Sequence, residues 1–300
     1  MLLVLFIAGK ATSFWSVSVD EYKLLGNVLL MTVVAFFGVA LPGYALVRHF
    51  WPESGWNLGG SVGTSVLQPL DLVLAGGFVS LWVLQWQQMP EQFANADLEE
   101  ALTAGEILAG ALVFVMLAAV IPLALFWRSN LCEFFGLRWH GWKSVFWIMP
   151  AFVVSMFALN VVMMLSGWPD WVKANFGGEG QKTVKLLSET NDLGMIGAMA
   201  FAAVIVAPIV EEVIFRGYIY PVVKRYSERS FAALFTGVLF GVIHFNLLSL
   251  PTLVVMGVVL VVLYEVTGSL WVTIACHAAF NGTTVGLMLW ARYSGIPLPQ

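Results

Sequence analysis

Residues 193–220 read LGMIGAMAFAAVIVAPIVEEVIFRGYIY. The first part of this stretch, 193–210, carries no charged residue, and two adjacent carboxylates, Glu211 and Glu212, follow before Arg216. A run of about 20 apolar residues is what an α-helix needs to cross a hydrocarbon core about 30 Å thick. The stretch therefore predicts a membrane-spanning helix that carries ionisable side chains.

The whole chain has the composition of a membrane protein. It has 300 residues, of which 60% are hydrophobic and 11% are charged, and its mean hydropathy is +0.86. About a quarter of the residues of a soluble domain are charged, so these values exclude a cytosolic globular enzyme. The net charge of −4 gives no basic surface, so we expect no nucleic-acid partner.

Uninterrupted apolar stretches predict an all-α, polytopic membrane protein with eight crossings and a buried polar site in its C-terminal half. We divide the chain into an N-terminal transmembrane region, 1–192, a catalytic core, 193–290, and a tail, 291–300. The opening segment Met1–Gly9 is too short to span and is expected at the membrane interface. The predicted crossings are Leu24–Val47, Leu67–Gln88, Ile107–Trp127, Val145–Trp168, Leu193–Tyr220, Phe231–Leu248, Thr252–Val266 and Leu270–Trp290.

Ionisable groups inside a membrane cost from about 2.5 to more than 10 kcal/mol each, so each one is a hypothesis of function. Residues four apart share a face of a helix, whereas neighbours diverge by about 100°. We therefore expect Glu212 to pair with Arg216 and Glu211 to point elsewhere, towards a cavity. Asp71 and Glu265 lie near predicted helix ends, where we expect them to be exposed to water.

Two further polar motifs follow in later crossings. Phe240 and His244 are four residues apart in the predicted sixth crossing, and His277 and Asn281 are four apart in the eighth. Each motif alone has a structural explanation, because a histidine or an asparagine in a membrane helix often only hydrogen-bonds to another helix. Their convergence with Glu211, Glu212 and Arg216 within a hundred residues favours a single functional site.

Such a set of side chains suits peptide hydrolysis. A carboxylate and a histidine can take the proton of a water that attacks a carbonyl, and a second histidine with a carboxamide can stabilise the oxyanion. Metal is the alternative, because His244, His277 and Glu211 form the two-histidine, one-carboxylate set of a catalytic zinc site. The residues alone leave both possibilities open.

The motifs EExxxR at 211–216, FxxxH at 240–244 and HxxxN at 277–281 resemble those of the CAAX protease and bacteriocin-processing (CPBP) family of intramembrane proteases, which includes the type II CAAX prenyl endopeptidases. The resemblance covers roughly 193–287, and Phe135 to Arg138 form a weaker match. By this resemblance Glu211 is the catalytic glutamate and Glu212 and Arg216 support it. His244 is then the partner in activating water, and His277 and Asn281 form the oxyanion side.

The resemblance implies an intramembrane endopeptidase that acts on a membrane-anchored or lipidated protein or peptide. We favour the glutamate mechanism, which requires no cofactor, over a zinc enzyme. The expected location is the plasma membrane of a bacterium, with the lipid bilayer and the membrane-anchored substrate as partners. The alternatives are a non-hydrolytic immunity or scaffold protein and a proton-coupled transporter. The lack of repeated halves disfavours the transporter.

Overall fold

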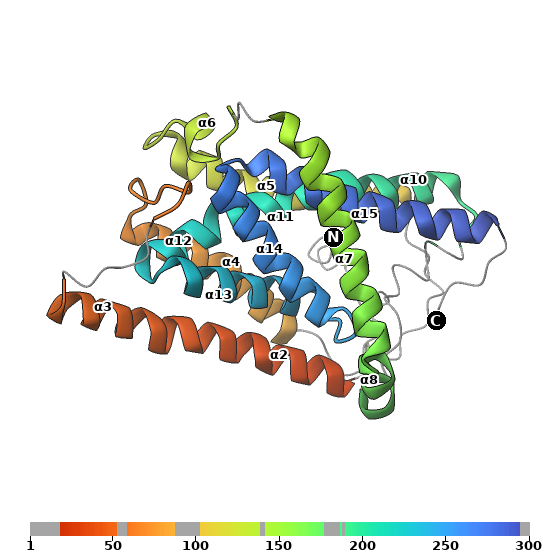
Figure 1. Cartoon of the computed structure of the whole chain (residues 1–300), viewed down its shortest axis with the longest axis horizontal. Coiled ribbons are helices and arrows are strands. Elements are labelled where there is room, and N and C mark those ends of the chain that lie inside the picture. Colours follow the sequence, from red (N-terminus) through yellow and green to blue (C-terminus); the bar gives the residue numbers. More distant parts are fainter. Residues whose placement is uncertain are drawn as a thin grey trace.

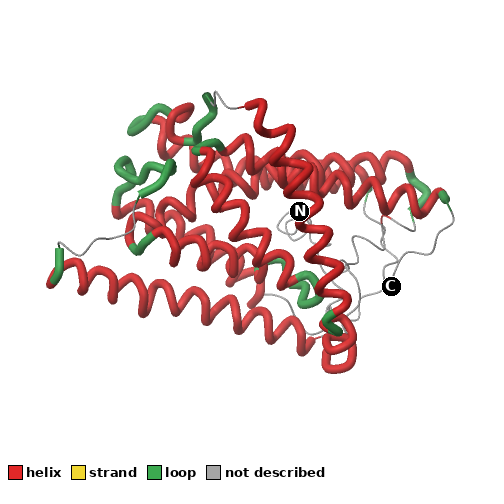
Figure 2. The backbone as a smooth tube through the Cα atoms, in the orientation of Figure 1, coloured by secondary structure: helices red, strands yellow, loops and turns green. Residues whose placement is uncertain are grey.

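The computed structural model describes residues 19–52, 59–87, 103–138, 142–176, 187 and 190–294. Within these ranges the chain is built of helices and connecting turns, with no strand (Figures 1 and 2). The all-α prediction is therefore confirmed for the described part. The predicted opening segment Met1–Gly9 and residues 295–300 of the predicted tail lie outside the described residues.

The helices follow the apolar stretches of the sequence closely. The N-terminal ones are α2 (Val19–Val34), which continues through a π-helical turn (Ala35–Ala40) into α3 (Leu41–Phe50), α4 (Pro69–Gln87), α5 (Ala104–Phe126), α6 (Leu131–Phe134), a 3₁₀ turn (Trp142–Ser144), α7 (Val145–Leu165) and α8 (Trp168–Phe176). The C-terminal ones are α10 (Leu193–Phe201), a π-helical turn (Ala202–Val206), α11 (Ala207–Ile214), a second π-helical turn (Phe215–Ile219), α12 (Tyr220–Tyr226), α13 (Arg229–Val242), α14 (Leu250–Thr267) and α15 (Leu270–Tyr293).

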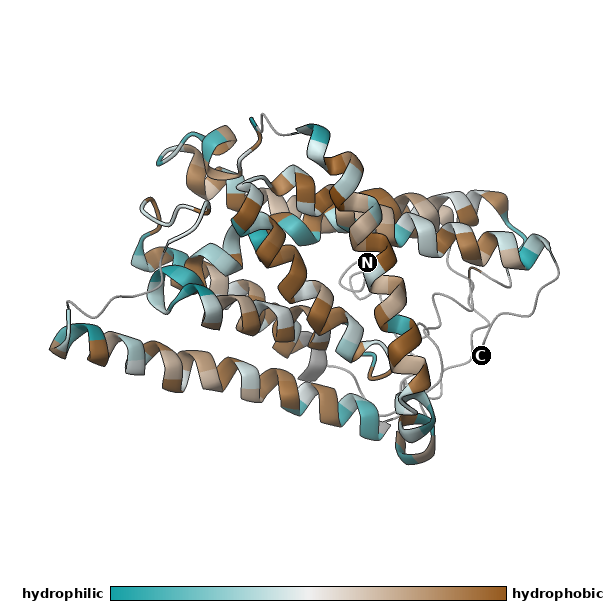
Figure 3. Cartoon of the chain, in the orientation of Figure 1, coloured by the Kyte–Doolittle hydropathy of each residue, from teal (hydrophilic) through white to brown (hydrophobic). Residues whose placement is uncertain are grey.

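Six of the described helices are long and apolar enough to cross a membrane. These are Asp20–Phe50, Ala104–Phe126, Trp142–Leu165, Leu193–Tyr226, Leu250–Thr267 and Leu270–Tyr293. The apolar part of α4 and the whole of α13 are shorter, so the predicted count of eight crossings stays a prediction. Hydrophobic residues run along the helices and hydrophilic residues concentrate near their ends (Figure 3), as expected for a chain surrounded by lipid.

Local sequence signals set several helix ends. The side chain of Thr103 accepts a hydrogen bond from the backbone N–H of Glu106, and Glu106 accepts one from the N–H of Thr103, which forms a capping box at the start of α5. Asp192 caps α10 in a similar way. At the other end of a helix, Gly268 terminates α14 with φ of 64°, a left-handed conformation that suits glycine.

Glycines bring α13 and α14 into close contact. A Cβ atom at Gly257 would lie 2.7 Å from Cα of Gly237, and one at Gly237 would lie 2.5 Å from Cγ2 of Val258. Small residues of this kind let the backbones of two membrane helices approach each other. The close approach fixes α13 against α14, and within the C-terminal half α12 packs on α13 and α15 packs on α14.

The expectation that Asp71 and Glu265 are exposed to water is wrong. Asp71 is fully buried and accepts two hydrogen bonds from Arg128, at 2.8 and 2.7 Å, and one from the hydroxyl of Tyr218. Glu265 is also buried, and its Oε1 atom lies 2.5 Å from Nζ of the buried Lys224. Cations from distant parts of the chain compensate the charges of both carboxylates. The position of Asp71 and Glu265 near helix ends does not reveal these partners.

Candidate active site

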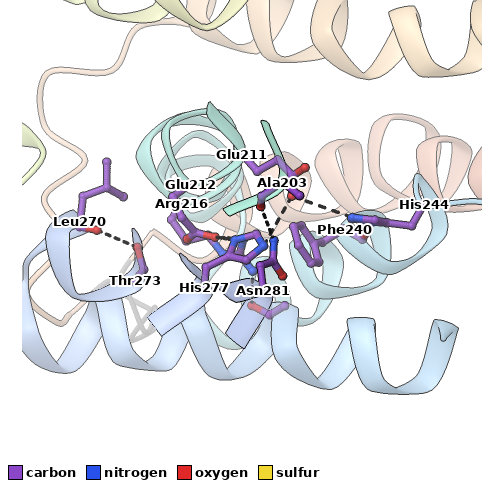
Figure 4. Close-up of polar contacts among 11 residues, drawn as sticks. Ala203, Glu211, Glu212, Arg216, Phe240, His244, Leu270, Thr273, His277 and Asn281 are labelled. Carbon is purple, nitrogen blue, oxygen red and sulfur yellow. Dashed lines mark hydrogen bonds and ion pairs between the residues drawn. The ribbon is translucent and has the colours of Figure 1, made fainter. Parts of the chain in front are cut away.

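A helical segment with two irregular turns carries the paired carboxylates. α11, which contains Glu211 and Glu212, lies between the π-helical turns 202–206 and 215–219. Such turns contain an extra residue and occur often at functional sites. Figure 4 shows the two glutamates pointing in different directions from this helix, as their adjacent positions predict.

Glu212 and Arg216 form a buried pair. The NH1 atom of Arg216 lies 2.7 Å from Oε1 of Glu212, and both side chains are 1% exposed or less. The NH2 group of Arg216 donates a hydrogen bond of 3.1 Å to the backbone carbonyl of Gly257 in α14. The predicted pairing of Glu212 with Arg216 is therefore confirmed, and the arginine also joins α14 to this segment.

Glu212 also orients a histidine. Oε1 of Glu212 lies 2.9 Å from Nδ1 of His277, whose side chain is 4% exposed. A carboxylate accepts hydrogen bonds, so Nδ1 of His277 carries the proton and Nε2 faces the other way. Glu212 thus has two partners, Arg216 within its own segment and His277 on α15, and it fixes the orientation of the imidazole.

Glu211 faces the two histidines. Its Oε2 atom lies 3.9 Å from Nε2 of His244 and 3.9 Å from Nε2 of His277. These distances are too long for direct hydrogen bonds, and they match groups that meet through a shared small molecule such as water. The side chain of Glu211 is 12% exposed, whereas that of Glu212 is completely buried. The structure therefore separates one enclosed carboxylate from one that faces the histidines (Figure 4).

His244 lies outside the helix in which we expected it. The predicted crossing Phe231–Leu248 is wrong at its C-terminal end, because α13 ends at Val242. A turn follows, with φ of 46° at Phe245, and His244 is part of this turn. The helical spacing still matters, since Nδ1 of His244 lies 2.6 Å from the backbone carbonyl of Phe240 and must donate to it. Nε2 of His244 is thereby left to face Glu211.

The ring of Phe240 contacts three of the polar side chains. Its centroid lies 4.8 Å from that of His244 and 5.8 Å from that of His277. The guanidinium carbon of Arg216 lies 4.5 Å from the same centroid, within the range of a cation–π interaction. The sequence marks Phe240 only as the first residue of a motif, and this central packing role becomes evident only in the structure.

A contact with the π-helical turn at 202–206 holds the side chain of Asn281. Its Nδ2 atom donates a hydrogen bond of 2.9 Å to the carbonyl of Ala203. A carboxamide has two N–H donors, so one bond of this kind leaves the second for another acceptor. His277 and Asn281 lie one turn apart on α15, as predicted, although each is anchored to a different neighbour. The sequence does not predict the carbonyl of Ala203 as the partner, because the two residues lie 78 positions apart on different helical segments.

The side chains proposed for zinc have suitable chemistry but a different arrangement. Nδ1 of each histidine is held by an acceptor, which is how metal-binding histidines are usually oriented. Ligands at 2.0–2.2 Å around a tetrahedral zinc ion lie about 3.4 Å apart, against 3.9 Å from Glu211 to each histidine here. Within the described ranges, no group of three or more His, Cys, Asp and Glu side chains is arranged to hold a metal ion. We therefore derive no step through a metal.

Comparison with known proteins agrees with the motifs. Residues 194–283 match the family described as "Type II CAAX prenyl endopeptidase Rce1-like". We call this segment, which is similar to that family, the Rce1-like segment. It contains Glu211, Glu212, Arg216, His244, His277 and Asn281. The resemblance predicted from the three motifs is confirmed for the Rce1-like segment, and the remainder of the chain lies outside the match.

A protein of Bacillus subtilis (strain 168), named "Putative membrane peptidase YdiL", is 28% identical to this chain over 146 residues. The matched part is 49% of this chain and 57% of that protein, so the comparison spans little more than half of the relative. No solved structure matches the chain significantly. Together with the six apolar helices, the Rce1-like segment identifies the chain as an integral multi-pass membrane protein.

Proposed function

We propose that the protein is an intramembrane endopeptidase that hydrolyses a peptide bond in a membrane-anchored or lipidated protein or peptide. The observation that carries this proposal is the position of Glu211, whose Oε2 atom is 3.9 Å from Nε2 of both His244 and His277. A water molecule can hydrogen-bond to a carboxylate and an imidazole held at such a distance. The likeness to prenyl endopeptidases and to a membrane peptidase supports the same activity.

In the proposed reaction, Glu211 and His244 activate the water. Glu211 accepts a proton as the water oxygen attacks the carbonyl carbon, and a bond between carbon and oxygen forms. The bond between carbon and nitrogen then breaks, and the proton passes from Glu211 to the departing amine. Water is thus divided between the new carboxyl group and the new amine, and no other reactant is consumed.

His277 and Asn281 would stabilise the oxyanion. Asn281 can donate its second amide N–H. His277 can donate from Nε2 only when both ring nitrogens are protonated, and its Nδ1 is held by Glu212. Arg216 offsets the negative charge of Glu212 and so keeps the two carboxylates of α11 from repelling each other. Glu212 and Arg216 therefore support the reaction without touching the substrate.

Replacement of Glu211 is the central test. Comparing the proteins of membranes with and without the wild-type protein identifies a membrane protein whose truncation requires it, and Glu211→Gln and His244→Ala should each abolish that truncation. Glu106→Gln is the matched control, since glutamine serves equally well in the capping box of α5. Retained cleavage in Glu211→Gln would disprove the mechanism. A biological effect that survives Glu211→Gln would instead support a scaffold or immunity protein.

A chelator separates the glutamate mechanism from the zinc mechanism. We expect the purified protein to keep its activity in a strong chelator and to contain less than one zinc ion per ten chains. Loss of activity in the chelator and recovery with added zinc would establish the metal mechanism, with His244, His277 and Glu211 as the ligands.

A further inference from the structure

The turn that carries His244 is held by two elements that lie outside the Rce1-like segment. α2 and α8 both approach the connection between α13 and α14 (Figure 1). We call this connection, residues 243–249, the His244 turn. Its contacts involve the first turn of α2, through Glu21 and Tyr22, and the first residue of α8, Trp168.

The backbone of the His244 turn needs external support. Phe245, the residue after His244, has φ of 46°, in the left-handed region that residues other than glycine rarely adopt. It is the only such residue other than glycine in the described part of the chain. Conformations of this kind persist only where the surroundings hold them in place, and they cluster at functional sites.

Glu21 holds the turn by a hydrogen bond to its backbone. Its Oε1 atom accepts a bond of 2.6 Å from the N–H of Leu247, and Glu21 is 1% exposed. Next to it, the ring of Tyr22 stacks on that of Phe245, with centroids 5.2 Å apart. On the other side, the indole N–H of Trp168 lies 3.2 Å from the carbonyls of both Leu247 and Leu248.

These contacts converge on a residue that the mechanism needs in one position. Nε2 of His244 lies 3.9 Å from Oε2 of Glu211. A shift of the turn by about 1 Å would change how the two groups share a water. A misplacement of that size can lower the rate of an enzyme about a hundredfold. The ring nitrogen Nδ1 is fixed to the end of α13 through Phe240, whereas the backbone beyond His244 is fixed by α2 and α8.

We propose that Glu21 is a positioning residue for the reaction: through the N–H of Leu247 it holds the His244 turn, and thereby His244, in the geometry that faces Glu211. Glu21 does not touch the reacting atoms. The catalytic part of this proposal rests on the proposed function, whereas the effect on the turn does not. The N-terminal region thus contributes to the site as well as to the membrane anchor.

The test uses the full-length protein in detergent or lipid with three variants. Glu21→Ala removes the acceptor, Glu21→Gln keeps a carbonyl oxygen that can accept from Leu247, and Asp20→Ala is a matched control at the neighbouring exposed carboxylate. Amide hydrogen exchange of residues 245–248 measures the turn without any substrate. Steady-state cleavage of the membrane protein whose truncation requires the wild type gives kcat and KM separately for each variant.

We expect Glu21→Ala to speed exchange in the turn at least tenfold and to lower kcat at least tenfold with KM within twofold. Glu21→Gln should restore kcat to within threefold of the wild type, and Asp20→Ala should match the wild type. A kcat within twofold of the wild type in Glu21→Ala, or no rescue in Glu21→Gln, would overturn the proposal. If Glu21→Ala does not accumulate, Trp168→Phe, which keeps an aromatic ring but removes the indole N–H, should still speed exchange and lower kcat about threefold, and unchanged values would overturn the proposal.

The two proposals fail in different ways. If no cleavage depends on Glu211 but exchange in the turn responds to Glu21→Ala, the proposed function is wrong and Glu21 still holds the turn. If cleavage depends on Glu211 but kcat is insensitive to Glu21→Ala, the positioning role is wrong and the protease remains.

Discussion

Replacement of Arg216 by methionine tests whether this arginine joins α14 to the segment that carries the glutamates. Arg216 is 1% exposed and makes contacts of two kinds. One is the ion pair with Glu212, four residues earlier in the same helical segment. The second kind joins Arg216 to other helices: a hydrogen bond to the carbonyl of Gly257 and a cation–π contact with the ring of Phe240. Methionine has a similar length and no charge, so it removes both kinds.

The two kinds of contact contribute differently to the free energy of unfolding. Glu212 is completely buried, and removing the cation of a buried ion pair costs about 3–5 kcal/mol. Hydrogen bonds between membrane helices contribute about 0.6–1.7 kcal/mol, and a cation–π contact contributes about 0.5–2 kcal/mol. We therefore expect Arg216→Met to lower the free energy of unfolding by at least about 3–5 kcal/mol, and Arg216→Lys, which keeps the charge but not the planar fork, by about half as much.

Reversible unfolding in mixed micelles, followed by tryptophan fluorescence, measures this difference. Arg138→Met is the matched control, because Arg138 is exposed and exposed substitutions usually stay within about 0.5 kcal/mol. A value for Arg216→Met that equals the control would refute the role of Arg216 between helices. Equal losses for the lysine and methionine variants would refute the contribution of the charge.

Three other substitutions test features of the fold. Gly257→Ala should destabilise the protein by about 1–3 kcal/mol in the same unfolding assay, because the new methyl group would lie 2.7 Å from Cα of Gly237. Gly136→Ala should lower the yield of folded protein in a size-exclusion assay, since φ is 62° there and the added Cβ would lie 1.6 Å from the carbonyl oxygen of Gly268. Lys224→Met should cost about 3–5 kcal/mol because it leaves Glu265 buried without its cation, and Glu265→Gln in the same chain should recover at least half of that loss.

Local patterns in the sequence predict much of this molecule. Apolar runs locate the helices, and the four-residue spacing of Glu212 and Arg216 correctly predicts their pairing, because both features depend on neighbours within one helix. Contacts between distant parts of the chain are not visible in this way. Asp71 and Glu265 were expected in water, and their burial becomes clear only when Arg128 and Lys224 are placed beside them.

The candidate site follows the same division. The motifs identify the residues that meet, but they do not reveal that His244 lies beyond the end of α13 or that Glu21 holds the turn around it. Glu21 precedes the predicted first crossing, 226 positions from Leu247, and its sequence context is that of any acidic residue at the start of a helix. The functional roles of the six motif residues remain predictions for the experiments above.

The π-helical turn at 202–206 makes the site depend on the exact number of residues before Glu211. Each such turn holds one residue more than a regular helix of the same height, and it rotates everything before it by about 100° relative to everything after it. Deletion of Val204 would allow a regular, fully hydrogen-bonded helix, which still crosses the membrane. The residues before and after the deletion would then face different directions than they do now. The carbonyl of Ala203, which accepts a hydrogen bond from Asn281, would point away from α15. A relative that lacks one alanine or valine of this turn would therefore keep every polar residue of the site in its sequence without bringing them together in space.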